Sequence, residues 1–112
     1  MKWWKKLKAK LFKPQKPVSA MQHLQRGLGK FAIGDFAGAL HEWDLAIQAD
    51  ATFFPAYYHR ALLLEEQGEI EKAVQDLLVA LDLAEQAGDR EQSKKIRQAL
   101  ARIHRKLEDA IS

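Results

Sequence analysis

Side chains that commonly carry catalysis or bind metals are few in this sequence, and they are scattered. The chain has no cysteine, which excludes thiol catalysis, thiolate metal sites and disulfide bonds. His41 precedes Glu42, but no second histidine stands four residues after the first, as the zinc metalloprotease motif requires. Gly27 and Gly29 lie inside a helical pattern with no strand before them, so they do not form a nucleotide-binding loop. The sequence therefore predicts no catalytic residue, no metal site and no cofactor.

The N-terminus carries a different chemistry, that of binding to a charged surface. Residues 1–17 contain seven lysines and no acidic residue, whereas residues 18–112 contain 11 basic and 15 acidic side chains, a balance of −4. The net charge of +3 is therefore a property of one short segment and not of the body. A basic tail on an acidic body indicates a segment that attaches the protein to an anionic partner.

The tail also has an apolar face if it forms a helix. At about 100° per residue, Trp3, Trp4, Leu7 and Leu11 fall together, and most lysines point away. Tryptophans beside lysines are typical of a helix that lies in a membrane interface. A helix this short is marginal in water and should form against a surface. The residues predicted to contact a membrane or a partner are Trp3, Trp4, Lys5, Lys6, Leu7, Lys8, Leu11 and Phe12.

Other roles for this tail remain open from the sequence. Lysines could bind phosphates while tryptophans stack on bases. However, the tail has no arginine and the acidic body would repel a polyanion, so nucleic acid is not the expected partner. Trp3, Trp4 and Leu7 could also pack into a groove of the protein itself or onto another protein. The tail could also be disordered and serve only to keep the protein soluble, but tails of that kind rarely carry two adjacent tryptophans.

The body reads as a series of helices. After the proline-containing spacer at residues 13–17, Ser19 and Gln22 form a capping box. We expect helices at about residues 19–33, 36–49, 53–67 and 70–86, and a fifth from Asp89 to about residue 111. The fifth helix should cover the last hairpin with the apolar stripe Ile96, Leu100, Ile103, Leu107 and Ile111. No apolar run reaches the roughly 20 residues that span a bilayer, and no secretory signal is expected.

One pattern of small and large residues recurs at an offset of 34 positions. Gly34, Ala39, Trp43 and Ala46 return as Gly68, Ala73, Leu77 and Ala80. The glycines suit a chain reversal in the left-handed conformation. The alanines allow two helices to approach closely, and the large residue fills the space between them. A period in the thirties indicates stacked helical hairpins.

This arrangement resembles the tetratricopeptide repeat family over residues 20–87. The second repeat carries the signature at Tyr57, Ala61, Leu64, Gly68, Ala73, Leu77 and Ala80, and the first at Gly27, Gly34, Ala39, Trp43 and Ala46. His23, Arg26 and Lys30 stand where the family usually has Trp, Leu and Tyr, and the expected proline at Ala51 is displaced to Pro55. The resemblance implies an all-α, right-handed solenoid with an N-terminal segment at 1–18, two repeats at 19–87 (about 20–53 and 54–87) and a capping helix at 88–112.

The family also implies a binding surface, because the first helix of each hairpin lines its concave face. The groove residues would be Leu24, Gln25, Leu28, Phe31 and Ala32, with Tyr58, His59, Leu62, Glu65 and Glu66. No Lys, Arg or Asn stands where some members clamp a C-terminal carboxylate. What remains is apolar and aromatic with an acidic edge, which suits an amphipathic, partly basic helix or an apolar peptide. For each of Leu28, Phe31 and Leu62, ordinary packing between neighbouring hairpins is the favoured interpretation. Gln25, Tyr58 and His59 are expected to be exposed.

The sequence therefore favours a non-enzymatic protein–protein interaction adaptor, cytoplasmic and peripheral to an anionic membrane, that acts as an assembly or scaffold factor. One alternative is a structural subunit of a larger complex with the tail docked on protein. Another is a nucleic-acid-associated protein that uses the Lys/Trp tail. Because solenoids generally need about three repeats, self-association into a homo-oligomer also remains open.

Overall fold

The computed structural model describes residues 2–11 and 17–112, and every regular element in this part of the chain is an α-helix. The helices are α1 (Trp3–Leu11), α2 (Ala20–Ala32), α3 (Phe36–Ala49), α4 (Phe54–Glu66), α5 (Ile70–Gln86) and α6 (Arg90–Ile111). The all-α prediction is confirmed, and each body helix begins and ends within one residue of the expected position. Phe12 and most of the proline-containing spacer lie outside the described residues.

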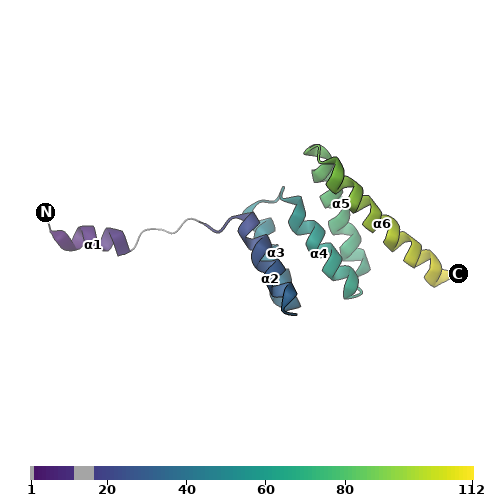
Figure 1. Cartoon of the computed structure of the whole chain (residues 1–112), viewed down its shortest axis with the longest axis horizontal. Coiled ribbons are helices and arrows are strands. Elements are labelled where there is room, and N and C mark those ends of the chain that lie inside the picture. Colours follow the sequence, from purple (N-terminus) through teal and green to yellow (C-terminus); the bar gives the residue numbers. More distant parts are fainter. Residues whose placement is uncertain (1, 12–16) are drawn as a thin grey trace.

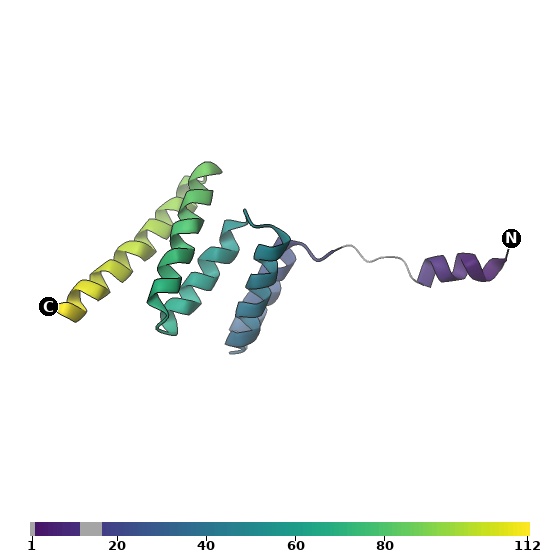
Figure 2. The ribbon, with the colours of Figure 1, turned by 180° about the vertical axis from the view of Figure 1, so that it is seen from behind.

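The helices α2/α3 and α4/α5 form two successive hairpins, and α6 packs next to α5 (Figure 1). Helices α2, α4 and α6 share one face of the stack. Figure 2 shows the opposite face, where α3 and α5 lie nearer the viewer. Helix α1 lies apart from this body (Figure 1).

The same device ends three of these helices. Gly34 and Gly68 both have φ of +83°, and Gly88 has φ of +72°. After the first glycine, the amide of Asp35 donates to the carbonyl of Lys30 at 2.9 Å, and Glu69 and Asp89 repeat this bond in the next two turns. This is a Schellman motif, in which glycine avoids the steric penalty of the left-handed conformation. The helix α6 therefore begins as α3 and α5 do, directly after a glycine turn.

The helix starts also follow from the sequence. Ser19 and Gln22 form the expected reciprocal capping box at the start of α2. Asp89 accepts a hydrogen bond from the amide of Gln92 at 3.1 Å at the start of α6. Pro55, displaced from its usual place in the repeat, lies in the first turn of α4. A proline is tolerated there because the first helical amides have no partner within the helix.

The core consists of the residues that recur at 34 positions. Their side chains are buried as predicted: Ala39, Trp43, Ala46, Ala73, Leu77 and Ala80. The indole nitrogen of Trp43 donates to the carbonyl of Leu24 at 3.3 Å. A β-carbon at Gly27 would overlap this indole ring. Gly27 is therefore small because Trp43 lies directly against the backbone of α2.

The capping stripe on α6 is buried over only part of its length. Ile96 and Ile103 are buried and Leu100 is half-buried, but Leu107 and Ile111 are 49% and 88% exposed. The prediction that the whole stripe covers the hairpin is wrong at these last two positions. The reason is geometric, since α6 diverges from α5 toward the C-terminus in both ribbon views.

Candidate protein-binding groove

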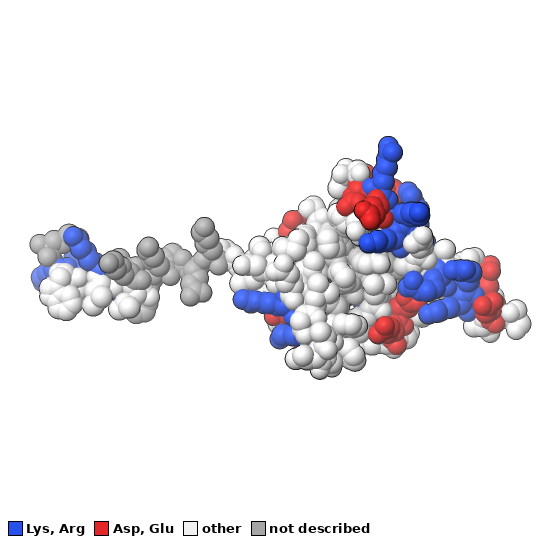
Figure 3. All heavy atoms as spheres, in the orientation of Figure 1, with Lys and Arg blue, Asp and Glu red and all other residues white. Residues whose placement is uncertain are grey.

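Two adjoining pockets lie on the face that α2, α4 and α6 share. One, of about 270 Å³, is lined by Leu28, Phe31, Trp43, His59, Leu62, Leu63 and Glu66. The other, of about 360 Å³, is lined by Tyr58, Leu62, Glu65, Glu66, Arg102 and Lys106. Because the pockets share Leu62 and Glu66, we treat them as one groove that runs from α2 across α4 to α6. Figure 3 shows this face, with a broad uncharged surface bounded by charged side chains on α6.

An aromatic row forms the floor of the groove. The ring centroids of Phe31 and Trp43 are 6.4 Å apart, those of Trp43 and His59 are 5.8 Å apart, and those of His59 and Tyr58 are 5.5 Å apart. Burial lowers the pKa of His59 below its ordinary value of 6.5. The imidazole is therefore neutral at pH 7, and it adds aromatic surface without charge.

The structure brings together most of the residues that the sequence assigned to this surface. Leu28 and Phe31 of α2 are 37% and 38% exposed, so neither is fully used in packing between the hairpins. On α4, spacings of three and four residues bring Tyr58, Leu62 and Glu65 to the same face, with His59 and Glu66 alongside. Tyr58 and His59, expected to be exposed, are partly buried by their neighbours.

Three of the expected groove residues lie elsewhere, and one of them, Ala32, is exposed but lines neither pocket. Leu24 is buried at 6% exposure, in the core cluster with Trp43, where no partner can reach it. Gln25 is exposed as expected, but it lines neither pocket. Leu24 and Gln25 share a helical face with the groove, yet the approach of α3 buries the first and leaves the second beside the groove.

The expected acidic edge is largely neutralised within the chain. The Glu65 carboxylate, whose side chain is 8% exposed, accepts hydrogen bonds from Arg102 at 2.6 Å and from Lys106 at 3.0 Å. These bonds, that to Arg102 foremost, lower the pKa of Glu65. Sequence reasoning did not find the two cations, although their four-residue spacing places both on one face of α6. Glu66 remains as an exposed acid that forms no ion pair within the described part of the chain.

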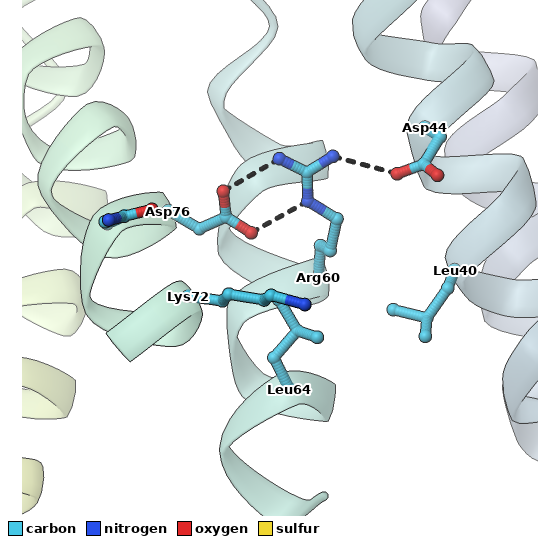
Figure 4. Close-up of a pocket in the computed structure, with 7 residues that line it drawn as sticks. Leu40, Asp44, Arg60, Leu64, Lys72 and Asp76 are labelled. Atoms are coloured by element: carbon cyan, nitrogen blue, oxygen red, sulfur yellow. Dashed lines mark hydrogen bonds and ion pairs between the residues drawn. The ribbon is translucent and has the colours of Figure 1, made fainter. Parts of the chain in front are cut away.

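A third pocket, between α3, α4 and α5, is occupied by an internal charge network (Figure 4). Arg60 donates two hydrogen bonds to Asp76 at 2.7 and 2.8 Å and a third to Asp44 at 2.8 Å. These hydrogen bonds, those to Asp76 foremost, raise the pKa of Arg60. This guanidinium joins the two hairpins and so serves the fold.

Helix α1 carries the tryptophans, leucines and lysines that the sequence assigned to contact with a membrane or a partner. The side chains of Trp3, Trp4, Leu7 and Leu11 are all exposed. Figure 3 shows lysines gathered on one side of the helix and uncharged side chains on the other. The ammonium group of Lys5 lies 5.8 Å from the ring centroid of Trp4. Phe12, assigned to the same surface, lies outside the described residues.

Neither a metal site nor a membrane-spanning helix is found in the part of the chain that the structure describes. Within residues 2–11 and 17–112, no group of three or more His, Cys, Asp or Glu side chains is placed to hold a metal ion. Among the same residues, no helix is long and apolar enough to cross a bilayer.

Comparison with known proteins gives a structural match. No protein-family model matches the sequence, and neither does any curated protein. The structure is similar to the crystal structure of a tetratricopeptide repeat domain protein from Salinibacter ruber, with a TM-score of 0.71 and 14% sequence identity over 76% of this chain and 94% of that chain. The chain has the tetratricopeptide repeat fold. Within it, α2 and α4 are the first helices of the two hairpins, and they line the groove described above.

Proposed function

We propose that this tetratricopeptide protein is a non-enzymatic adaptor whose groove binds an amphipathic helix or an apolar peptide segment of another protein. The observation that carries the proposal is the continuous groove on α2, α4 and α6, with Leu28 and Phe31 partly exposed beside an aromatic floor. Recognition of a helix in a groove requires such an apolar surface. Arg102 and Lys106 are engaged by Glu65, so they do not offer a clamp for a C-terminal carboxylate.

We further propose that α1 holds the adaptor on an anionic membrane surface as a peripheral, cytoplasmic protein. Its exposed tryptophans and leucines suit the interface, and each lysine near an anionic leaflet contributes about 1 kcal/mol. Attachment would raise the concentration of the groove where a membrane complex is assembled. The role would then be that of an assembly or scaffold factor.

The groove is tested by capture from a detergent-solubilised membrane fraction with the immobilised full-length protein. Leu28→Asp places a charge in the groove and should abolish capture of the specific partners. Leu78→Asp is the matched control, because Leu78 is 53% exposed on α5 and lines none of the groove. Circular dichroism should show both variants folded. Equal capture by the two variants would place the binding surface elsewhere.

The membrane contact is tested with vesicles. In a Trp43→Phe background, which removes the buried indole, anionic vesicles should blue-shift the tryptophan emission and raise the helicity of the protein. Zwitterionic vesicles should bind it far less, and salt should weaken the binding. Changing Trp3 and Trp4 to Ala should remove much of the affinity if the helix inserts. A protein that ignores anionic vesicles but binds single-stranded nucleic acid at physiological salt would contradict the proposal.

A further inference from the structure

The apolar face of α1 needs a cover whenever the protein is not on a membrane. This helix has nine residues, and isolated helices shorter than about 12–15 residues are marginal in water. Four large apolar side chains on one short segment, Trp3, Trp4, Leu7 and Leu11, are exposed. The groove is another partly open apolar surface of the chain, because its residues Leu28 and Phe31 are also exposed in part.

The chain between the two surfaces is long enough to bring them together. Residues 12–19 connect α1 to α2, and eight residues span at most about 26–29 Å. At 1.5 Å per residue, the distance from Trp3 to Leu11 along α1 is about 12 Å, and the distance from Ala20 to Leu28 along α2 is also about 12 Å. If the chain reverses so that α1 runs antiparallel to α2, the end bearing Trp3 and Trp4 lies level with Leu28 and Phe31.

The pocket beside Leu28 and Phe31 has a lining and a size that suit a tryptophan side chain. Its lining consists mainly of Leu28, Phe31, Trp43, His59 and Leu62, and its volume of about 270 Å³ accommodates an indole ring. Aromatic pairs in offset or edge-to-face geometry add stability beyond the burial of area. Charge contributes through one group, because the exposed Glu66 at the edge of the pocket is a carboxylate that a lysine flanking the apolar face of α1 can approach.

We propose that, away from a membrane, α1 folds back into the groove of its own chain and places Trp3 or Trp4 in the pocket between Leu28 and Leu62. A short linker gives an effective concentration in the millimolar range, so even a contact with a Kd of about 1 mM is half-occupied. The membrane and the groove compete for the same face of α1. Membrane attachment therefore opens the groove to its partner, a step that rests on the helix-binding function proposed above.

The absence of native cysteines allows a direct distance measurement in the full chain. Cysteines replace Lys6, on the outer face of α1, and Gln25, which is exposed beside the groove. Both carry spin labels, and pulsed electron resonance reports their separation. The antiparallel docking brings these positions side by side, so the protein in buffer should show a narrow, short-distance component. A second pair, with the body label moved to the exposed Gly29, checks that the label at residue 25 does not itself alter docking.

Variants and lipids define the outcome. Changing Trp3 and Trp4 to Ser, or Leu28 to Asp, should remove the short component, and Leu78→Asp should leave it. Anionic vesicles should replace it with a broad, longer distribution, whereas zwitterionic vesicles should not. Dilution of the labelled protein with excess unlabelled protein should leave the short component unchanged. Loss of the short component on dilution would show that α1 docks on another copy of the chain. A broad distribution in lipid-free buffer would show that α1 is not docked. Either result overturns the proposal.

The same variants separate this inference from the adaptor function. If the Trp3/Trp4 variant still captures partners in a Leu28-dependent manner while no short distance is seen, the adaptor function stands and the docking of α1 is wrong. If docking occurs, the Trp3/Trp4 variant should capture more partner than the wild type in the absence of lipid. Equal capture by the two proteins despite a short distance would show that α1 does not occlude the groove.

Discussion

At the scale of single residues, packing around Trp43 decides which small side chains the fold requires. A β-carbon at Gly27 would overlap the indole, whereas one at Gly29 would meet no atom within 4 Å. Both glycines lie in α2, two positions apart, so helix propensity disfavours both alike. The difference in unfolding free energy between alanine variants at the two positions therefore measures the cost of placing a methyl group where α2 and α3 approach closely.

We expect Gly27→Ala to destabilise the protein by about 1–3 kcal/mol, because the methyl group overpacks the core. Gly29→Ala should instead stabilise it by up to about 1 kcal/mol, since alanine is the better helix former at an exposed site. Urea unfolding followed by circular dichroism measures both. Equal effects of the two substitutions would show that Trp43 moves aside at little cost.

At the scale of the helices, Arg60 ties the two hairpins together. It holds Asp76 of α5 through two hydrogen bonds and Asp44 of α3 through one. The side chain of Asp76 is 11% exposed, whereas that of Asp44 is 50% exposed. Both ion pairs use the guanidinium of Arg60. Water competes effectively only with the exposed pair to Asp44.

Asp76→Asn should therefore cost about 2 kcal/mol, below the full cost of breaking a buried pair because Arg60 is itself partly exposed. Asp44→Asn should cost no more than about 0.5 kcal/mol, as is typical of an exposed pair. Thermal melts of the two variants give the comparison, and added salt should reduce the smaller effect. A larger loss for Asp44→Asn would mean that the contact with α3 holds the hairpins together.

At the scale of the whole molecule, two carboxylates join different helices, one within the first hairpin and one between α4 and α6. Glu42 of α3 lies 2.8 Å from His23 of α2, and Glu65 of α4 binds Arg102 and Lys106 of α6. The pKa of Glu42 is lowered mainly by its hydrogen bond with His23, and that of Glu65 mainly by Arg102. The stack as a whole is therefore sensitive to acid.

A carboxylate whose pKa is lowered by folding stabilises the protein fully above its unfolded pKa of about 4.5 and loses that contribution as pH falls through the folded pKa. His59, whose pKa folding also lowers, adds an earlier loss that begins below about pH 6.5. Melting temperature should thus fall in two stages between pH 7 and pH 3. His59→Phe should remove the first stage and Glu65→Gln should flatten the second, and a single stage unchanged by either substitution would refute this account.

How much the sequence alone could predict depends on the range of the interaction. The five body helices, the caps at Ser19 and Asp89, the turns at Gly34 and Gly68 and the six recurring core positions arise from local preference and from spacing within one helix, and the sequence predicted them. It did not predict the cap at Asp35 or the third glycine turn at Gly88. The position of Leu24 in the core, the ion pairs of Glu65 and the exposure of Leu107 depend on how separate helices cross. The spacing of residues within one helix does not specify the angle at which two helices cross.

The 34-residue period by itself thus determined a stack of helical hairpins, and the Lys/Trp tail by itself indicated a short N-terminal helix with basic and apolar side chains. Only the tertiary structure decided which of the expected residues line the groove and which charges remain in it. The periodicity of a helix specifies which of its faces is apolar. Which helix packs against that face depends on how helices far apart in the chain cross one another. For that reason Arg102 and Lys106 reach Glu65 across the groove, and its acidic edge is reduced to Glu66.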